Sequence, residues 1–302
     1  MNTPIECSSF SQYKLIDSGN RYKLEQFGDY ILSRPEPQAL WSPSLNDAQW
    51  KKLAHTHFER DKNNPEKGIW QKLKPMPDRW KMTHQHQGMQ LQFRLGMTSF
   101  KHIGLFPEQA ENWNYIYDMI SHIKSKEITP KVLNLFAYTG GASLAAKAAG
   151  SDVVHVDAVK QVVTWANENM QLSSLDGIRW VVEDAMKFVK REQKRGSKYN
   201  GIILDPPAYG RGPDGEKWVL EENIDELLSI CRQIASENHF FIILNLYSMG
   251  YSPIIAGTLL ETHFKHLKNI QYGEMYFTDE HKKKMPLGIY ARGATNTILN
   301  PK

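Results

Sequence analysis

Residues 131–150, KVLNLFAYTGGASLAAKAAG, decide the fold. The first eight residues are a short apolar run of the kind found in a buried strand, and the small residues after the two glycines predict a helix. Gly150 provides a natural end for that helix. This strand, tight turn and helix form the first unit of an alternating pattern.

The same alternation continues toward the C-terminus. Apolar strand patterns occur in DVVHVDA, IRWVVEDA, YNGIILDPP and HFFIILNLYS, and each of the first three is followed by a helical pattern before the next strand. Strands that alternate with helices predict a mostly parallel sheet with helices on both faces. Residues 269–294 predict two further strands joined by a polar loop, as an edge hairpin.

The chain before this region shows a different pattern of predicted strands and helices. Residues 13–35 predict alternating strands around a Ser-Gly-Asn turn, a capped helix is expected from Asn46 or Asp47, and residues 88–97 alternate again. Residues 107–125 then have helical spacing. We therefore expect a small N-terminal α+β module over residues 1–100 and an α/β domain over residues 101–302.

Composition limits the class of protein. The 302 residues are 41% hydrophobic and 23% charged, which is ordinary for a soluble globular protein. Only two cysteines are present, no apolar run approaches about 18 residues, and the first residues lack signal-peptide features. These observations predict a cytoplasmic protein without a membrane span.

The charge is distributed unevenly although the formal net charge is only +4. Residues 51–100 carry ten Lys or Arg against four Asp or Glu. Such an excess can bind a polyanion, and the alternative interpretation is a solvated face.

Three strand ends carry residues suited to a ligand, because ligands of open parallel sheets bind beyond the carboxyl ends of the strands. The turn after the first strand has Gly140 and Gly141 but not the G-x-G-x-x-G of a pyrophosphate site, and Thr139 and Ser143 offer hydroxyls there. Asp157 ends the second strand, seventeen positions after Gly140, which suits ribose hydroxyls. Glu183-Asp184 ends the third strand, where a carboxylate can accept from an adenine amino group. A nucleoside with a charged amino-acid tail, S-adenosylmethionine, satisfies all three loops.

The motifs LNLFAYTGGAS, VVHVDA, VVEDAMKF and LDPPAYG resemble those of class I S-adenosylmethionine-dependent methyltransferases. With RYKLEQFGDYILSRPEPQALW and FKHIGLFPEQAENW, the resemblance extends over most of the chain, and it is greatest to the group of bacterial large-subunit rRNA cytosine methyltransferases, without their PUA domain. The resemblance implies a Rossmann-like seven-stranded sheet and S-adenosylmethionine as the cofactor.

The resemblance also implies roles for individual residues. The first motif, which would hold the methionine end of the cofactor, comprises Phe136, Ala137, Tyr138, Thr139 and Gly140.

Outside this motif, Asp157 would bind the ribose, Asp184 would face the adenine amino group, and Asp205 would lie beneath the transferable methyl group. GLFPEQ resembles a loop that closes over the cofactor, which makes Phe106 and Gln109 further candidates. A ring in the core is the alternative interpretation of Phe106.

The stretch LDPPAYG suggests how an acceptor is held. Pro207 has no amide hydrogen, so the carbonyl of Pro206 is free to accept, together with Asp205, from an exocyclic amino group. Tyr209 could then stack on a flipped base. The alternative is a proline-stiffened loop with a packed tyrosine.

One feature of the resembling enzymes is absent. Methylation of cytosine C5 uses a cysteine that adds to the ring, and in related sequences it is expected just after the fifth strand. This chain has Ser248 and Met249 there. Cys231 lies in a predicted helix as a small core residue, and Cys7 in a predicted terminal tail. Methylation of a nitrogen, an oxygen or a different substrate therefore stays open.

Other candidates have weaker patterns. The pairs His55/His57 and His84/His86 lack the carboxylates or cysteines of a zinc site, so no metal is expected. Arg211 and the HKKK run at 281–284 are either solvated or phosphate-binding. Trp70 and Trp80 fit a module core better than a stacking surface.

The sequence thus predicts methyl transfer to a nucleobase, with RNA as the partner. The alternatives are a protein or small-molecule acceptor, a non-catalytic RNA-binding protein with a vestigial pocket, and a nicotinamide-dependent oxidoreductase, which the absent G-x-G-x-x-G disfavours.

Overall fold

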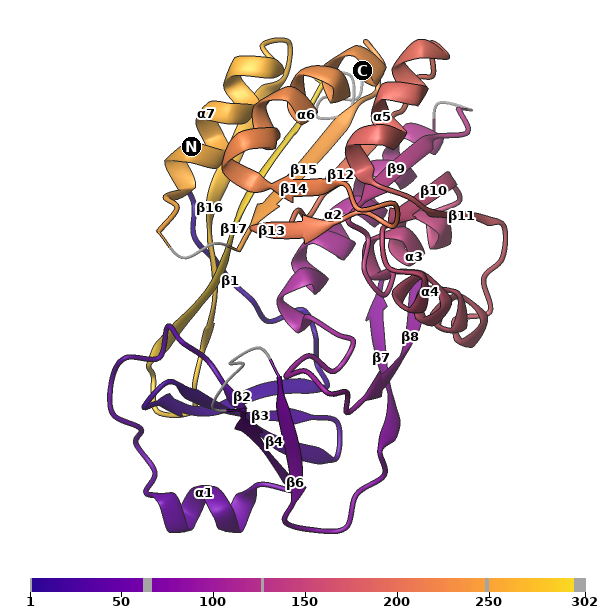
Figure 1. Cartoon of the computed structure of the whole chain (residues 1–302). Helices are drawn as coiled ribbons and strands as arrows, with labels where there is room; N and C mark the ends of the chain where they lie inside the picture. Colours follow the sequence, from indigo (N-terminus) through magenta and orange to yellow (C-terminus); the bar gives the residue numbers. More distant parts are fainter. Residues whose placement is uncertain (1, 62–66, 126–127, 248–249, 296–302) are drawn as a thin grey trace.

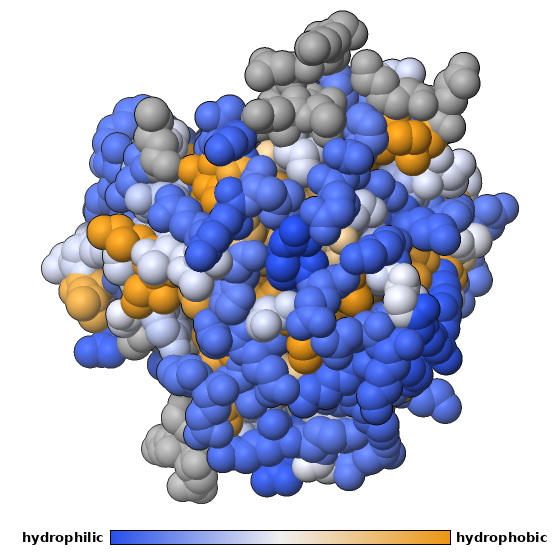
Figure 2. All heavy atoms as spheres, turned by 90° about the horizontal axis from the view of Figure 1, so that it is seen from above, coloured by the Kyte–Doolittle hydropathy of each residue, from blue (hydrophilic) through white to orange (hydrophobic). Residues whose placement is uncertain are grey.

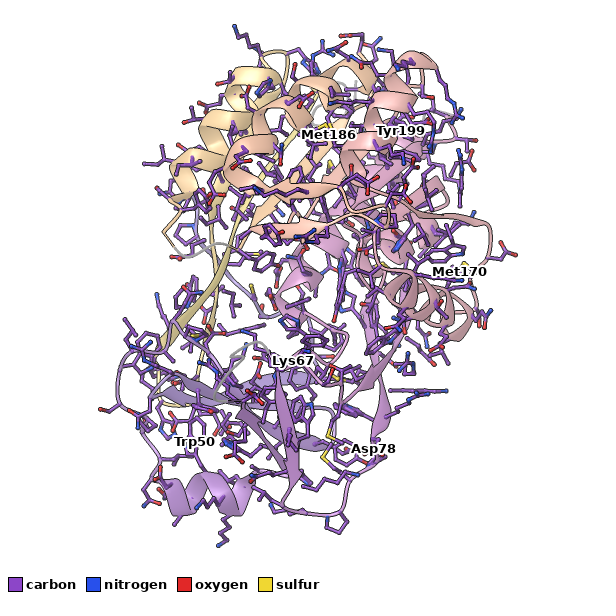
Figure 3. All side chains as sticks on the ribbon, viewed as in Figure 1. Trp50, Lys67, Asp78, Met170, Met186 and Tyr199 are labelled. Carbon is purple, nitrogen blue, oxygen red and sulfur yellow. The ribbon has the colours of Figure 1, made fainter. Side chains whose placement is uncertain are left out.

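The computed structural model describes residues 2–61, 67–125, 128–247 and 250–295. A large sheet flanked by helices occupies one end of the molecule, and a smaller β-rich module occupies the other (Figure 1). Trp50 and Asp78 lie in the module, whereas Met186 and Tyr199 lie at the opposite end (Figure 3). Ser248 and Met249 fall outside the described residues.

The large sheet has the predicted parallel core. Its order is β1-β16-β17-β15-β12-β9-β10-β11, in which the neighbours from β15 to β11 are all parallel and β17 is antiparallel to both β15 and β16. The strands are β9 (Lys131–Leu135), β10 (Asp152–Asp157), β11 (Ile178–Val182), β12 (Gly201–Leu204), β15 (Phe241–Leu246), β16 (Lys268–Thr278) and β17 (Lys284–Ala294), with β1 (Ile5–Glu6) as an eighth. The seven expected strands and the C-terminal hairpin are confirmed.

Helices cover both faces of this sheet. Alternate residues of a strand enter different cores: Val132 packs in the same cluster as α2 and α3, and Leu133 in the same cluster as α5, α6 and α7. Because both faces are buried, the central strands are apolar throughout rather than alternating. The helices are α2 (Ala110–Lys124), which follows the 3-10 turn η1 (Pro107–Gln109), α3 (Gly141–Ala148), α4 (Lys160–Leu172), α5 (Ala185–Lys194), α6 (Leu220–Ile234) and α7 (Pro253–His263).

The module contains a five-stranded sheet and one short helix. Its helix α1 (Asp47–Leu53) begins as predicted, with Asn46 and Gln49 forming a capping box. Trp80 is buried, and the Trp70 indole donates to the carbonyl of Thr98. The strands are β2 (Tyr13–Gly19), β3 (Tyr22–Phe27), β4 (Tyr30–Pro35), β5 (Thr56–Arg60) and β6 (Gly68–Lys72), with a separate hairpin of β7 (Arg79–His86) and β8 (Met89–Gly96). The boundary near residue 100 stays a prediction.

The surface seen from above is mainly hydrophilic, with hydrophobic residues in small separate groups (Figure 2). Within the described ranges, every helix is too short or too polar to cross a membrane.

The N-terminal residues differ from the expected tail. Strand β1 pairs in parallel with β16, with Ile5 opposite Met275. Cys7, directly after β1, is 6% exposed and belongs to the core cluster that contains Phe277. The prediction of a terminal tail at Cys7 was therefore wrong, because the edge of β16 offers hydrogen bonds that sequence periodicity does not reveal.

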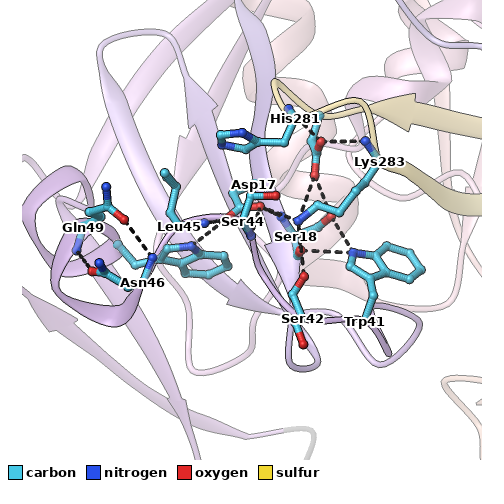
Figure 4. A network of polar contacts seen from close by, with 12 residues as sticks. Asp17, Ser18, Trp41, Ser42, Ser44, Leu45, Asn46, Gln49, His281 and Lys283 are labelled. Atoms are coloured by element: carbon cyan, nitrogen blue, oxygen red, sulfur yellow. Dashed lines mark hydrogen bonds and ion pairs between the residues drawn. The ribbon is translucent and has the colours of Figure 1, made fainter.

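A polar cluster joins the module to the tip of the β16–β17 hairpin (Figure 4). Asp17 of β2 is fully buried and accepts from Lys283 Nζ at 2.7 Å, as well as from Leu45 N and Trp50 Nε1, both at 2.8 Å. Lys283 Nζ also donates to Ser18 O at 2.7 Å. One lysine of the HKKK run is thus a structural contact rather than a solvated residue. We call the contacts between Asp17, Ser18 and Lys283 the hairpin clamp.

Replacing Lys283 by methionine removes the cation that neutralises the buried Asp17 carboxylate. We expect Lys283→Met to lower the free energy of unfolding by about 2 kcal/mol in denaturant titrations at pH 7. Lys282→Met is the matched control, because Lys282 is exposed beside it, and should change the free energy by less than about 0.5 kcal/mol.

The size of this effect should depend on pH. Burial raises the pKa of Asp17, but hydrogen bonds from Lys283, Leu45, Trp50 and Ser44 outweigh burial and lower the pKa below 3.8. A carboxyl group with a lowered pKa stabilises the fold above its unfolded pKa, and this stabilisation is lost as the pH falls through the folded pKa. The difference between Lys283→Met and the wild type should therefore shrink below about pH 4. A constant difference from pH 7 to pH 3 would contradict this account.

Candidate functional site

Four strand ends converge at one edge of the large sheet. Asp157 ends β10, Asp184 lies two residues after β11, Asp205 follows β12, and Tyr247 follows β15. Since these strands are parallel and lie next to one another around β9, their carboxyl ends share an edge, as the sequence predicted. This edge faces the module across a cleft.

The turn after β9 has an unusual backbone. Phe136, Tyr138 and Gly140 have φ angles of 55°, 49° and 91°, so every second residue is left-handed. This conformation costs about 1–2 kcal/mol for each residue that is not glycine. The turn is held by hydrogen bonds from Ala137 N to Val156 O at 3.1 Å and from Tyr138 N to Asp157 Oδ2 at 2.9 Å. Such strain at a cleft is typical of a ligand-binding loop.

The two glycines of the turn are required by close packing. Gly140 is the N-cap of α3, and a Cβ on it would lie 3.1 Å from the Ala166 Cβ. A Cβ on Gly141 would lie 2.4 Å from Trp113. The backbone at the start of α3 can therefore come close both to the protein and to a ligand.

Asp157 positions this turn as well as facing the cleft. Its Oδ1 accepts from Val159 N at 2.9 Å, and its Oδ2 accepts from Tyr138 N. Burial raises the pKa of Asp157, and these two hydrogen bonds partly oppose the rise. Each carboxylate oxygen retains a lone pair that can accept from a hydroxyl group.

A narrow cavity, which we call the edge cavity, lies beyond Asp157. Asp184 is the N-cap of α5 and accepts from Lys187 N at 2.8 Å, while its side chain also lines this cavity. The cavity is lined by Phe136, Val156, Asp157, Ala158, Glu183, Asp184, Ala185, Gly210, Arg211, Gly212 and Trp218. The aromatic rings of Phe136 and Trp218 and the Asp184 carboxylate are thus among its lining residues, and a carboxylate can accept from an amino group of a purine.

A second narrow cavity, the loop cavity, surrounds the turn after β9. It is lined by every residue of the predicted first motif together with Phe106, Gln109 and Asp205, among others. The Gln109 amide donates to the Tyr247 hydroxyl, and Asn112 Nδ2 donates to Gln109 Oε1 at 2.9 Å. Thr139 Oγ1 donates to Gly104 O at 2.7 Å, so this hydroxyl is already engaged within the protein.

Ser143 is also engaged within the protein. Its buried hydroxyl accepts from Asn134 Nδ2 at 2.9 Å and lies 3.0 Å from His155 Nδ1. Through these contacts with Asn134 and His155, the Ser143 hydroxyl joins the first turn of α3 to β9 and β10.

The central cavity, of about 480 Å³, connects these two cavities to the module. Phe106, Tyr138, Asp157 and Asp205 each line it and one of the narrow cavities, and Phe136 lines all three cavities. Its module side is formed by residues of β3, β4 and the segment before η1, namely Lys23, Arg34, Pro35, Glu36, Pro37, Gln38, Lys101 and His102. The cleft thus lies between the strand ends that carry Asp157 and Asp205 on one side and the module on the other.

Asp205 carries a side-chain oxygen that can accept a hydrogen bond from a ligand. Its Oδ1 is buried and has no hydrogen-bond partner among the described residues. Burial, together with the nearby Glu108 carboxylate, raises the pKa of Asp205 to about 7. A buried acceptor without a partner is costly, so this atom is suited to a ligand donor.

The residues after Asp205 divide between cleft and surface. Pro206 lines the central cavity, while the carbonyl of Pro207 accepts from Trp218 Nε1 at 2.7 Å. Tyr209 and Arg211 lie in the short hairpin of β13 (Tyr209–Arg211) and β14 (Lys217–Val219). Tyr209 is 52% exposed and lies outside the lining of all three cavities, so its stacking role stays a prediction.

The structure adds residues that sequence reasoning missed. Glu108, Tyr247 and His102 line the central cavity, and Trp218 lies 4.8 Å from Phe136 between ring centroids. Glu108 lies inside GLFPEQ, of which only Phe106 and Gln109 were predicted to lie near the cofactor. The module residues carried no local signal, because only the tertiary fold brings them to the cleft.

The histidine pairs have partners within the protein. His84 contacts Asn114, His86 contacts Asp118, and His57 contacts Ser33, each through one ring nitrogen at 2.8–2.9 Å. Within the described part of the chain, His, Cys, Asp and Glu form no group that could hold a metal ion.

The three connected cavities fit S-adenosylmethionine. The edge cavity suits adenine, Asp157 suits the ribose hydroxyls, and the strained turn with the α3 N-terminus suits the carboxylate of the methionine part. The unpartnered Asp205 Oδ1 lies where this cleft opens into the central cavity.

Known proteins with similar sequences are methyltransferases. The ribosomal RNA large subunit methyltransferase K/L of Shewanella frigidimarina is 29% identical over 182 residues, which is 58% of this chain and 24% of the relative. The ribosomal RNA large subunit methyltransferase I of Escherichia coli is 33% identical over 185 residues, which is 56% of this chain and 44% of the relative. The chain therefore matches less than half the length of either relative.

Solved structures agree with this likeness. The crystal structure of a SAM-dependent methyltransferase from Agrobacterium tumefaciens is 36% identical, has a TM-score of 0.87, and covers 97% of this chain and 93% of its own. The structure of SMU.776 complexed with SAH is 17% identical, with a TM-score of 0.70 over 95% of this chain and 76% of its own, and shows the shared fold alone.

A family model described as S-adenosylmethionine-dependent methyltransferase matches residues 30–237. Because this match covers more than half of the chain, the protein belongs to the S-adenosylmethionine-dependent methyltransferases.

Proposed function

We propose that the protein transfers a methyl group from S-adenosylmethionine to a nucleobase in RNA. The observation that carries the proposal is the cleft in which the unpartnered Asp205 Oδ1 meets a cavity of about 480 Å³ walled by the module. The names of the rRNA methyltransferases to which the chain is similar support RNA as the acceptor class.

When bound, S-adenosylmethionine supplies an electrophilic methyl group on a sulfonium. Direct displacement at this carbon depends on alignment more than on a strong acid. In this proposal Asp205 and the Pro206 carbonyl accept hydrogen bonds from an amino group and so hold its lone pair toward the methyl group; both residues line the central cavity. Phe136, Tyr247 and residues of the module line the cavity around this point.

The cysteine route to carbon methylation has no support in the described residues. Cys231 is fully buried in α6, and burial raises its pKa to about 12. Burial also raises the pKa of Cys7, with Glu108 and Glu111 adding to the rise. Neither thiol lines any of the three cavities, so neither is placed to form a ring adduct.

RNA binding would use exposed charge on the module and at the rim. Lys51, Lys52 and Lys81 are exposed, whereas Arg94 is committed to Glu168 at 2.6 Å and lies over the Trp165 ring. Part of the basic excess is therefore available to phosphates and part of it is structural. A cytoplasmic location belongs to the same proposal and is supported by two cysteines that are both free thiols.

Cofactor binding should depend on Asp157. We expect Asp157→Ala to weaken the affinity for S-adenosylhomocysteine by about 10- to 100-fold in calorimetry, because a carboxylate acceptor and the anchor of the Tyr138 amide are both lost. Asp152→Ala, at the other end of β10, is the control and should bind normally. Equal affinity of Asp157→Ala and the wild type would contradict the assignment.

The acceptor class can be identified by labelled transfer. The protein is incubated with tritium-labelled S-adenosylmethionine and with separate RNA, protein and small-molecule fractions, and we expect label in the RNA alone. The transfer rate at limiting RNA should fall steeply with salt, because phosphate contacts release counterions, whereas S-adenosylhomocysteine affinity should change little. Label in protein or small molecules instead of RNA would reject the RNA proposal, and no transfer to any fraction would favour a vestigial pocket.

The role of Tyr209 is separable from cofactor binding, because its ring lies outside the three cavities. If the ring stacks on a base, Tyr209→Ala should lower kcat/KM for RNA by about 10-fold or more, and Tyr209→Phe should retain activity. S-adenosylhomocysteine affinity should be the same in both variants. Full activity of Tyr209→Ala would show that the exposed ring has no part in catalysis.

A further inference from the structure

A second buried carboxyl group lies in the central cavity beside Asp205. Glu108, in η1, is 5% exposed and lines the same cavity as Asp205. The two groups are close enough for the charge of Glu108 to raise the pKa of Asp205. The mechanism described above uses only one of these two carboxyl groups.

The surroundings of Glu108 leave it available to a ligand. Lys23 of β3 is its main positive neighbour, and this lysine lies 3.3 Å from both Glu25 and Glu36. Arg34 of β4 is held by Glu25, with contacts of 2.8 and 3.1 Å. Both cations therefore have carboxylate partners of their own.

The segment before η1 contributes Lys101 and His102, which line the same cavity, and burial lowers the pKa of His102 to about 4, so its ring is neutral near pH 7. The other titratable and charged groups around Glu108 are Cys7 after β1, Tyr13 of β2, Lys23 and Glu25 of β3, Arg34 of β4, Asp205 after β12 and Tyr247 after β15. Burial raises the pKa of Glu108 to about 7, Lys23 lowers it, and Glu25 raises it. Because the pKa of each of these two carboxyl groups is raised to about 7, each is partly protonated near neutral pH.

We propose that Glu108 and Asp205 form a two-carboxyl acceptor site, in which Asp205 orients an N–H group of the methyl acceptor and Glu108 takes its proton. This inference rests on the proposed methyl transfer and specifies its acceptor as a nitrogen that carries hydrogen. The nitrogen lone pair forms the new N–C bond, the electrons of the broken C–S bond stay on sulfur, and the nitrogen proton passes to the Glu108 carboxylate.

The pair also responds to the charge of the cofactor. A sulfonium beside two carboxyl groups favours their ionised forms, whereas the neutral sulfur of S-adenosylhomocysteine does not. Binding of S-adenosylmethionine should therefore release protons from the pair and leave Glu108 ionised, ready to accept a proton from the acceptor.

The number of protons released when the cofactor binds tests the Glu108–Asp205 pair in the absence of a methyl acceptor. Calorimetry at pH 7 in two buffers of different ionisation enthalpy counts the protons released. We expect S-adenosylmethionine to release roughly 0.5–1 proton more than S-adenosylhomocysteine. Equal release by the two ligands in the wild type overturns the proposal. Absence of binding by both ligands would instead reject the cofactor site.

A variant links this proton to Glu108. In Glu108→Gln one of the two titrating carboxyl groups is gone, while burial still raises the pKa of Asp205, so the difference in proton release should fall to about half. Glu111→Gln is the matched control, because Glu111 lies one turn away, caps the backbone amides of Ser8 and Ser9, and is outside the cavity lining. A difference in proton release that keeps its wild-type size in Glu108→Gln overturns the role of Glu108.

Transfer into RNA gives the second measurement. Wild-type single-turnover rates should rise with pH through a midpoint below about 7, because a bound sulfonium lowers the pKa values of the pair, and Glu108→Gln should lower the rate by about 100-fold and alter this pH dependence. Its affinity for S-adenosylhomocysteine should stay unchanged. Mass spectrometry should find the methyl group on nitrogen, and a carbon- or oxygen-methylated nucleoside overturns the inference. If no label enters RNA but S-adenosylmethionine still releases more protons than S-adenosylhomocysteine, RNA is rejected as the acceptor and the carboxyl pair is retained.

Discussion

One ion pair, between the buried Asp17 and Lys283, ties the module to the large sheet beside the apolar core that the two parts share. The central cavity has walls from the strand ends of the large sheet and from β3 and β4 of the module, so its shape requires the two parts to hold a fixed relation. The hairpin of β16 and β17 extends to the module, and its tip supplies Lys283. Asp17 is fully buried and also accepts hydrogen bonds from the backbone amides of Ser44 and Leu45, just before α1. Its carboxylate therefore joins two segments of the module to each other and to the hairpin.

A second carboxylate, Asp157, performs the comparable task on the cofactor side. The left-handed residues Phe136 and Tyr138 are unfavourable on their own, and the amide of Tyr138 is stabilised by Asp157 Oδ2. The residue expected to bind the ribose therefore also shapes the turn that receives the methionine end. Cofactor affinity and the conformation of the turn are consequently coupled through one side chain.

The sequence predicts local features of this molecule well and long-range ones poorly. Parallel strands, the Gly140 turn and the carboxylates at strand ends follow from periodicity and from the rule that parallel strands end at one edge. The pairing of β1 with β16, the burial of Cys7 and the contact of Lys283 with Asp17 join residues more than 260 positions apart. Glu108 was visible in GLFPEQ, but its approach to Asp205 depends on how η1 lies over the sheet edge.

The module also sets the electrostatics of the acceptor site, whether or not it binds RNA. Lys23 and Arg34 oppose the rise in the pKa of Glu108, while their own partners Glu25 and Glu36 keep them from neutralising it completely. Without β3 and β4, Glu108 and Asp205 would lie open to water and would lose the burial that raises the pKa of both. The proton chemistry of the cleft is therefore a property of the module and the large sheet together.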